Sequence, residues 1–181
     1  MSLYECLSSV EDPRRAEGKR TTLEQMFCMI IISNLCGHFG GRPIARFSKI
    51  HASTFEEYLK LKHGVPSHVT FSGLLNGVDN AQLIEAFNEW ASGYTDLEEG
   101  DAVSGDGKAL GSTVTSKANG SGQRFQAIVS IFCQQTGLVR ALEDYQNAKT
   151  SEINVVQFLI QQLAGLGITI YLDALHAQKK L

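Results

Sequence analysis

The sequence predicts an α+β protein, in which an all-helical first half is followed by a half built of strands and one helix. Apolar residues recur at helical spacing before residue 95, whereas runs of β-branched and aromatic residues occupy the part after residue 101. Between these parts lies an acidic, turn-rich segment, TDLEEGD, at 95–101. We therefore expect a helical domain at 1–95 and a second domain at 96–181.

The composition is that of a globular protein, because 43% of the 181 residues are hydrophobic, which is enough to build a core. The longest apolar run, at 26–32, is far shorter than the ~18 to 20 residues that cross a bilayer. Acidic residues stand where a signal peptide has its basic start. We expect a cytoplasmic protein with no membrane partner. The formal net charge is −3, so any contact with nucleic acid must be local.

The cysteines and the N-terminal cations do not by themselves indicate a site. The four cysteines are scattered, without a CxxC pair or a histidine at zinc-finger spacing: Cys6, Cys28, Cys36 and Cys133. We expect reduced, mostly buried thiols. Cations cluster between residues 14 and 20, but acidic residues lie among them, which favours a solvated loop over a phosphate-binding site.

The first well-marked helix is LEQMFCMIIISNLC. Thr21 with Glu24, or Thr22 with Gln25, fits a capping box in front of it, and Gly37 follows as a stop signal. Its apolar composition predicts a buried helix.

Two shorter helices follow. One begins at Arg42, because Pro43 suits the first turn of a helix. The next is expected at 54–62, with Ser53 as its cap and Gly64 after its end.

The last two helices of this half are expected after Ser67 and after Asn80, both of which are suitable caps. The second runs to about Tyr94, and its apolar stripe is interpreted as core: Leu83, Ile84, Phe87, Trp90, Ala91 and Tyr94. A helix-turn-helix made of 66–77 and 80–94 is disfavoured. The polar face of its second helix has two acids and no cation: Gln82, Glu85, Asn88 and Glu89.

The second half begins with strands. A short strand at 102–105 is expected to end on Asp106, a longer one spans 125–133, and a turn at 135–137 leads into a strand at 138–145. The last two form an antiparallel pair.

A helix and a final strand complete the pattern. Thr150 or Ser151 caps the helix, which ends near Gly165, and its apolar face has Ile153, Val156, Ile160 and Leu163. The strand at 168–172 leads directly to Asp173. The order is strand, strand, strand, helix, strand.

Asp106 and Asp173 are the candidate catalytic and metal-binding residues. A right-handed crossover would pair their strands in parallel and bring both carboxylates to neighbouring strand ends. Phosphoryl transfer commonly uses two divalent ions held by carboxylates. Gly105 and Gly107 would leave room for a phosphate to approach. The alternative is that each aspartate only forms a turn, because GDG is a common turn sequence.

Five segments of the chain resemble one family: DPRRAEGKRTTLEQMFCMIIISNLCG, HGVPSHVTF, GDGKALGST, KTSEI and TIYLDALHAQKK. From about Leu3 onward the sequence is similar to the front part of a bacterial insertion-sequence DDE transposase, of the subgroup with an H-repeat-associated N-terminal domain. The resemblance implies a ribonuclease-H-like sheet that carries Asp106 and Asp173 as the first two members of an acidic triad. It also implies Mg²⁺ or Mn²⁺ as cofactor, and insertion-sequence ends and target DNA as partners.

Other residues match motif positions of this family without a role that their chemistry assigns: Lys108, Lys149, Glu152, His176 and Gln178. Lys108 is either a phosphate contact or a solvated lysine. His176 contacts DNA or caps a turn, and the helix dipole alone suffices to explain Glu152.

The chain departs from the family at two places. Val69 stands where an acidic residue is usual, which weakens any role for that segment. The third carboxylate, a glutamate on a helix beyond a fifth strand, is expected past residue 181, and Glu143 and Asp144 are poorly placed to replace it. We expect a truncated transposase with an incomplete ribonuclease-H-like domain and little or no strand cleavage or transfer.

Two further hypotheses compete with this one. The chain could serve without catalysis as a module that binds DNA or transposase subunits. It could also be a metal nuclease that completes its site with Glu143, Asp144 or a second subunit.

Overall fold

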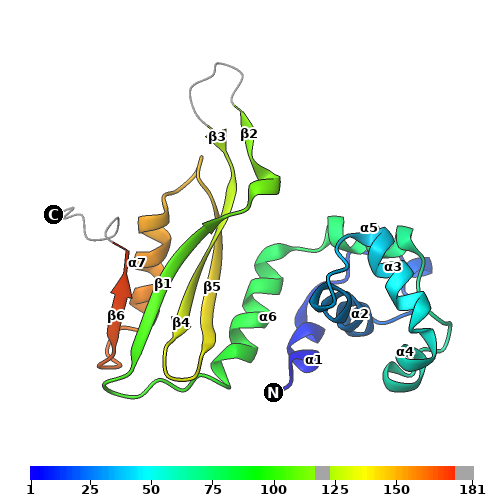
Figure 1. Cartoon of the computed structure of the whole chain (residues 1–181), viewed down its shortest axis with the longest axis horizontal. Helices are drawn as coiled ribbons and strands as arrows, with labels where there is room; N and C mark the ends of the chain where they lie inside the picture. The colour runs from blue at the N-terminus through cyan, green and yellow to red at the C-terminus, as the bar shows by residue number, and fades with distance from the viewer. Residues whose placement is uncertain (117–122, 174–181) are drawn as a thin grey trace. The chain divides into compact units, whose positions relative to one another are not determined.

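The computed structural model describes residues 1–116 and 123–173. The chain forms two compact units, Met1–Ala86 and Phe87–Leu181. Helices make up the first, and a mixed sheet with a packed helix makes up most of the second, which confirms the α+β class (Figure 1). The domain bounds 1–95 and 96–181 stay a prediction.

The first unit is built from α-helices and two short 3₁₀ turns, at Leu7–Ser9 and Ala16–Gly18. The helices are α1 (Leu3–Cys6), α2 (Leu23–Leu35), α3 (Gly41–Ile50), α4 (Ala52–Leu59), α5 (His68–Gly77) and α6 (Asn80–Ser92), the last of which continues into the second unit. Its largest fully buried side chains come from α2, α3 and α5: Met26, Met29, Ile44, Phe71 and Leu74.

Helix α2 begins as predicted. The Thr22 hydroxyl accepts a hydrogen bond from the Gln25 backbone N–H (3.3 Å), and the Gln25 side chain accepts one from the Thr22 N–H (2.9 Å). Gly37 follows the helix with φ +83°, so the stop signal is also confirmed. The predicted burial is confirmed for one side of the helix, which includes Met26 and Met29, whereas Ile32 and Leu35 are 42% and 83% exposed.

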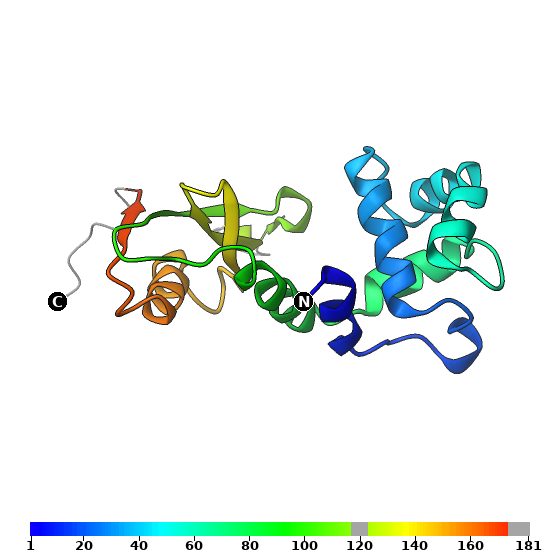
Figure 2. The same ribbon diagram turned by 90° about the horizontal axis from the view of Figure 1, so that it is seen from below.

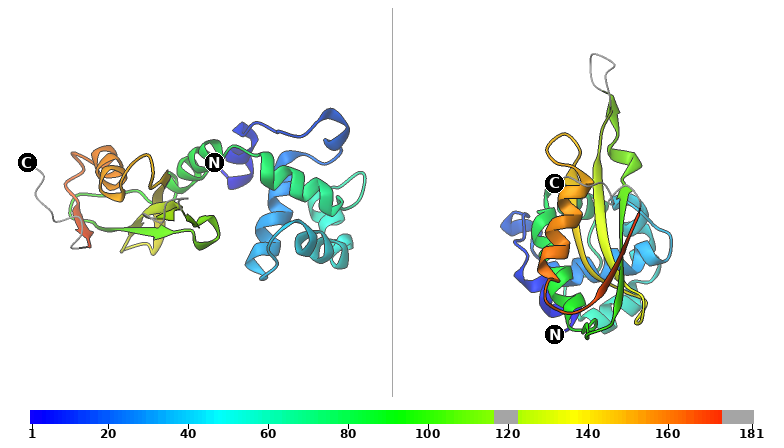
Figure 3. Two further views of the ribbon diagram at one scale, coloured as in Figure 1. Left: turned by 90° about the horizontal axis from the view of Figure 1, so that it is seen from above. Right: turned by 90° about the vertical axis from the view of Figure 1, so that its left-hand side faces the viewer.

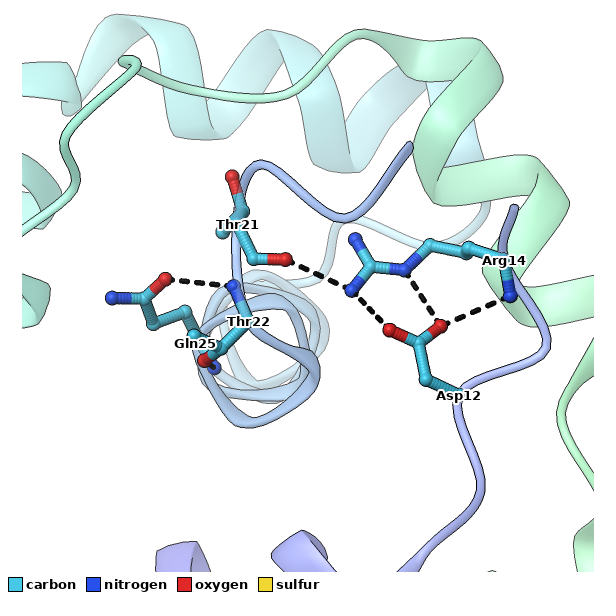
Figure 4. Close-up of polar contacts among 5 residues, drawn as sticks. All are labelled: Asp12, Arg14, Thr21, Thr22 and Gln25. Carbon is cyan, nitrogen blue, oxygen red and sulfur yellow. Dashed lines mark hydrogen bonds and ion pairs between the residues drawn. The ribbon is translucent and has the colours of Figure 1, made fainter. Parts of the chain in front are cut away.

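The loop before α2 is held by Arg14 (Figure 4). Its guanidinium donates from Nε to Asp12 Oδ1 (2.9 Å) and from Nη2 to Asp12 Oδ2 (2.7 Å). Nη2 also donates to the Thr21 carbonyl, 2.9 Å away. The Arg14 side chain is only 5% exposed, so this arginine serves the fold. Burial alone would raise the pKa of Asp12, but the hydrogen bonds and charge of Arg14 lower it below its usual value.

The caps of the later helices differ partly from expectation. Ser67 caps α5 as predicted, accepting from the Thr70 N–H at 3.4 Å. Helix α4 begins at Ala52, directly after α3, and has no side-chain cap, so the cap assigned to Ser53 is wrong. The predicted cap Asn80 is the first residue of α6. The cap is Asp79, one residue earlier, whose carboxylate accepts a hydrogen bond from the Ala81 N–H (2.9 Å).

The main sheet of the second unit has the order β5-β4-β1-β6. Its strands are β1 (Ala102–Ala109), β4 (Gln126–Cys133), β5 (Leu138–Gln146) and β6 (Thr169–Leu172). β4 pairs antiparallel with both β1 and β5, whereas β6 pairs parallel with β1, as the crossover predicted. A second, two-stranded ladder of β2 (Thr115–Ser116) and β3 (Gln123–Arg124) was not predicted, because strands of two residues show no periodicity.

Helix α7 (Glu152–Gln162) covers one face of this sheet, as Figure 2 and Figure 3 show. Ser151 caps it by accepting from the Asn154 N–H. The core combines residues of the sheet with the buried face of the helix and its end: Val103, Ala127, Val129, Ile131, Ala141, Tyr145, Val155, Val156, Leu159 and Leu163. The helix thus buries Val155 and Leu159 more fully than the predicted Ile153 and Ile160.

The outer edge of β5 is partly occupied by a side chain of α6. Asn88 donates from Nδ2 to the Leu142 carbonyl (2.9 Å), and its Oδ1 accepts from the Leu142 N–H (2.8 Å). The amide therefore bonds to β5 as a neighbouring strand would. Such pairing removes exposed edge groups that otherwise attract other chains.

The cysteines and the hydropathy of the helices are unremarkable for a folded chain. The four cysteines form no disulfide within the described residues; Cys6 and Cys133 are buried, Cys28 is half-buried and Cys36 is exposed. No helix within the described ranges has the length and apolar character that crossing a membrane requires.

The Asp12–Arg14 pair gives a testable pH dependence. We expect Asp12→Asn to lower the free energy of unfolding of the helical unit near neutral pH by about 1.5–3 kcal/mol, the range for hydrogen bonds to charged groups. Because the folded-state pKa of Asp12 is lowered, its contribution is present above the ordinary value near ~4 and is lost as pH falls through the lowered value.

Urea unfolding followed by far-ultraviolet circular dichroism measures this difference. The variant and the parent should converge in acid. Glu11→Gln, an exposed neighbour, is the matched control and should change little. Equal stability of Asp12→Asn and the parent at neutral pH would contradict the assignment.

The Asn88 contact makes a second prediction. Asn88→Ala should destabilise the sheet unit by about 1–3 kcal/mol, because two backbone groups of Leu142 lose their partner. Asn88→Asp should cost at least as much, since a carboxylate cannot donate to the Leu142 carbonyl. Unfolding is followed by fluorescence of Trp90, the chain's single tryptophan. Glu89→Ala, on the exposed side of α6, serves as control and should leave the transition in place.

Candidate active site

The segment around Asp106 is the middle of a strand. β1 continues to Ala109, with Asp106 opposite Ser130 and Gly107 opposite Val129 in β4. The prediction that the strand ends in a turn at Asp106 is therefore wrong. The alternative interpretation of GDG as a turn sequence is wrong for the same reason.

Gly105 and Gly107 suggested a turn, but in the structure they make room for the side chains of neighbouring elements. A Cβ on Gly105 would lie 2.8 Å from Leu172 Cδ2 and 3.3 Å from Ile131 Cδ1. A Cβ on Gly107 would lie 2.6 Å from both carboxylate oxygens of Glu152. The space beside the glycines is thus filled by protein side chains, which corrects the expectation that a phosphate approaches there.

Side chains of β1 alternate between the two faces of the sheet. Val103 is buried in the core with α7, and Gly105 and Gly107 share its face. Asp106 therefore points to the opposite face, here called the aspartate face, together with Lys108. Both residues are exposed.

Strand β6 brings Asp173 to the same place. Its parallel register with β1 runs from Ala102 opposite Thr169 to Gly105 opposite Leu172. Asp106 is the next residue of β1, and Asp173 directly follows the end of β6. Neighbouring strands lie about 4.8 Å apart, and their aligned residues point to the same face. If the alignment continues by one residue beyond the pairing of Gly105 with Leu172, the two exposed carboxylates share the aspartate face.

The register is fixed at the start of both strands by backbone hydrogen bonds. The Thr169 N–H donates to the Asp101 carbonyl (2.7 Å), and the Gly100 N–H donates to the Gly167 carbonyl (3.0 Å). Gly100 and Gly167 have φ values of +94° and +68°, which favour glycine. A shift of β6 by one residue would turn Asp173 to the other face.

Glu152 lies on the α7 side of the sheet. Its carboxylate accepts a hydrogen bond from the Tyr145 hydroxyl (3.3 Å) and packs on Gly107. Burial raises the pKa of Tyr145, and the charge and hydrogen bond of Glu152 raise it further. Glu152 therefore has a packing partner that the sequence did not reveal.

The other predicted residues lie elsewhere or outside the described part. Lys149 follows β5, where its N–H donates to the Gln146 carbonyl (2.9 Å), and lines a hollow of about 460 Å³ between β5 and α7. His176 and Gln178 lie outside the described residues.

Glu143 and Asp144 do not join the aspartate pair. Glu143 is two residues from Tyr145 on β5, so both side chains lie on the α7 face. Burial there raises the pKa of Glu143, and the charge of Asp144 raises it further. Asp144 is on the aspartate face, but β4 separates its strand from β1. Within residues 1–116 and 123–173, no three His, Cys, Asp or Glu side chains are grouped so that they could hold a metal ion.

Ser130 is the neighbour of the pair that sequence reasoning missed. It lies directly opposite Asp106 in β4 and points to the aspartate face. Only the register of β1 with β4 identifies it, and a single sequence carries no signal for that register.

Comparisons with known proteins agree with part of this picture. Residues 4–91 match a family model described as DDE_Tnp_1-associated, which indicates an N-terminal region of a DDE transposase family. A curated relative from Xanthobacter autotrophicus, described as "Uncharacterized protein in dhlA 3'region", is 28% identical over 172 residues. The alignment covers 94% of this chain and 57% of the relative, so the chain spans little more than half of that protein's length. No solved structure matches.

The packing on Gly105 can be tested by mutation. Gly105→Val should destabilise the sheet unit by about 1–3 kcal/mol, the usual cost of overpacking, because the new side chain displaces Leu172 and Ile131. Lys108→Val, on the exposed side of the same strand, is the matched control. Urea unfolding followed by Trp90 fluorescence measures both. A Gly105→Val variant as stable as Lys108→Val would show that β6 does not pack on Gly105.

Proposed function

We propose that this chain acts in DNA transposition as part of a DDE transposase, and that Asp106 and Asp173 hold a divalent metal ion on a ribonuclease-H-like sheet. One observation carries the proposal. The parallel register of β1 and β6 ends one residue before Asp106 and Asp173, and both aspartates are exposed. The family match of residues 4–91 supports the transposase assignment.

The topology supports the ribonuclease-H-like fold. Three antiparallel strands in the order β5-β4-β1 are followed by α7 and by a strand parallel to β1. Asp106 lies on the central β1 and Asp173 directly after the neighbouring β6, which is consistent with the first two positions of the triad.

The carboxylate pair fits Mg²⁺ or Mn²⁺. These are hard cations that take oxygen ligands, and Mg²⁺ is usually held by one or two carboxylates together with substrate phosphates and water. Both aspartates are exposed, so water and a phosphate reach the same face. In two-ion phosphoryl transfer, one ion activates the attacking oxygen and the other stabilises the leaving oxygen, and Asp106 and Asp173 would supply ligands for such ions.

The chain's own residues orient the substrate. Lys108 lies on the aspartate face, two residues from Asp106, where its ammonium can pair with a DNA phosphate. Strand cleavage and transfer need a third carboxylate in this family, and the described residues group none with the pair. We therefore propose weak metal binding by the two aspartates and dependence of cleavage on a carboxylate from outside the described residues.

Mn²⁺ binding tests this proposal without relying on catalysis. The free-ion signal in electron paramagnetic resonance gives the affinity of the full chain. Asp106→Asn and Asp173→Asn should each weaken it at least about tenfold, which corresponds to ~1.4 kcal/mol. Asp144→Asn removes a carboxylate from the same face two strands away and should leave the affinity unchanged.

A Mn²⁺-dependent plasmid-nicking assay with the same variants then measures cleavage. Affinity that is insensitive to both aspartates would overturn the metal site and favour the alternative function, a DNA- or transposase-binding module without catalysis.

A further inference from the structure

Helix α3 has a cationic face that sequence reasoning missed. Arg42, Arg46 and Lys49 recur at helical spacing and are all exposed. The opposite face is buried through Ile44 and Ala45, which are 1% and 4% exposed. The spacing of the cations is visible in the sequence, although the grouped arginines at 14–20 are more conspicuous. Arg42, Arg46 and Lys49 together form the cationic face of α3.

The fold does not use these charges. None of the three cations forms an ion pair or a side-chain hydrogen bond with the described residues, in contrast to the buried Arg14. Helix α3 contains no acidic residue. Arg42 stands in the first turn, where the helix dipole disfavours a cation. An anion from outside the unit would offset this arrangement.

The helix is held rigidly behind its cationic face. The backbones of α3 and α5 approach each other closely at Gly41. A Cβ at this position would lie only 2.9 Å from both the His68 carbonyl oxygen and the Ser72 nitrogen. Ser48 is completely buried. The three cations are therefore presented at a fixed spacing, which lowers the entropy cost of binding a repeating anion.

We infer that the cationic face of α3 binds the phosphate backbone of duplex DNA. This inference rests on the proposed function for the identity of the partner. From Arg42 to Lys49 the helix rises about 10.5 Å, at 1.5 Å per residue. Duplex DNA carries one phosphate charge for every ~1.7 Å of its axis, both strands counted, so a face of this length lies near more than one phosphate. Contacts of this kind position a protein on DNA and do not read its sequence.

Fluorescence anisotropy of a labelled duplex, measured with the full chain in EDTA over a range of salt concentrations, tests the inference. The triple variant Arg42→Gln, Arg46→Gln, Lys49→Gln should lose about three units of the slope of log affinity against log salt. Its affinity at low salt should fall at least tenfold. The control Arg15→Gln, Lys60→Gln, Lys62→Gln removes the same number of charges at other exposed positions. It should keep most of the salt slope and most of the affinity at low salt.

Two further measurements keep the outcome clear. Circular dichroism verifies that the triple variant is folded. The charge-retaining variant Arg42→Lys, Arg46→Lys, Lys49→Arg should keep the parental slope. Equal losses in the triple variant and the control, no loss in the triple variant, or no binding by the parent would each overturn the inference.

The DNA-binding assay and the Mn²⁺ assay fail separately. EDTA removes metal ions, so duplex binding does not depend on Asp106 or Asp173. A chain that binds Mn²⁺ through its aspartates but not DNA through α3 would refute this inference and leave the metal site standing. The reverse result would refute the metal site alone.

Discussion

The parallel pairing of β6 with β1 is the constraint on which the candidate site depends. Asp173 follows β6, and only this register brings it beside Asp106 on the same face. The pairing is fixed by backbone hydrogen bonds where the strands begin and by the packing of Leu172 on Gly105. The contacts that fix the pairing come from Gly100, Asp101, Gly167, Thr169 and Leu172, which precede the two aspartates in the sequence.

Strand β1 meets two different demands on its two faces. Toward α7 it has Val103 and two glycines, which admit the side chains of neighbouring elements. Toward the other side it presents the charged Asp106 and Lys108. Because side chains alternate along a strand, the residues that tune packing and those that face substrate can vary independently. The close packing of Glu152 on Gly107 shows that the α7 side of β1 has no room for a larger side chain there.

Local signals were readable from the sequence, and the helix caps at Thr22, Ser67 and Ser151 are the clearest cases. Such caps depend on residues three positions apart, so a single sequence contains all the information needed. The topology was also predictable, because a strand, helix and strand in series obey the right-handed crossover rule. That rule gives the hand of the connection, and the prediction that β6 pairs with β1 on the far side of the sheet is confirmed by the observed register.

Features that depend on distant residues were not readable. The GDG sequence is typical of a turn. In the structure it lies within β1, where Leu172 packs beside Gly105 and Glu152 beside Gly107. In the same way, composition does not reveal that Arg14 forms an ion pair with Asp12 whereas the cations of α3 are exposed. The sequence thus identified the aspartates as residues of interest, and the register decided which face they occupy.

The long sequence separation of β1 and β6 has a consequence for biosynthesis. During translation β1 and β4 can pair early, since they are joined by a comparatively short segment, whereas the other edge of β1 stays unsatisfied until β6 leaves the ribosome. Non-local pairing of this kind forms slowly, because the loop must close before the contacts stabilise it. The segments that carry the two aspartates therefore come together only after β6 has paired with β1, and a nascent chain that lacks β6 does not yet have Asp173 near Asp106.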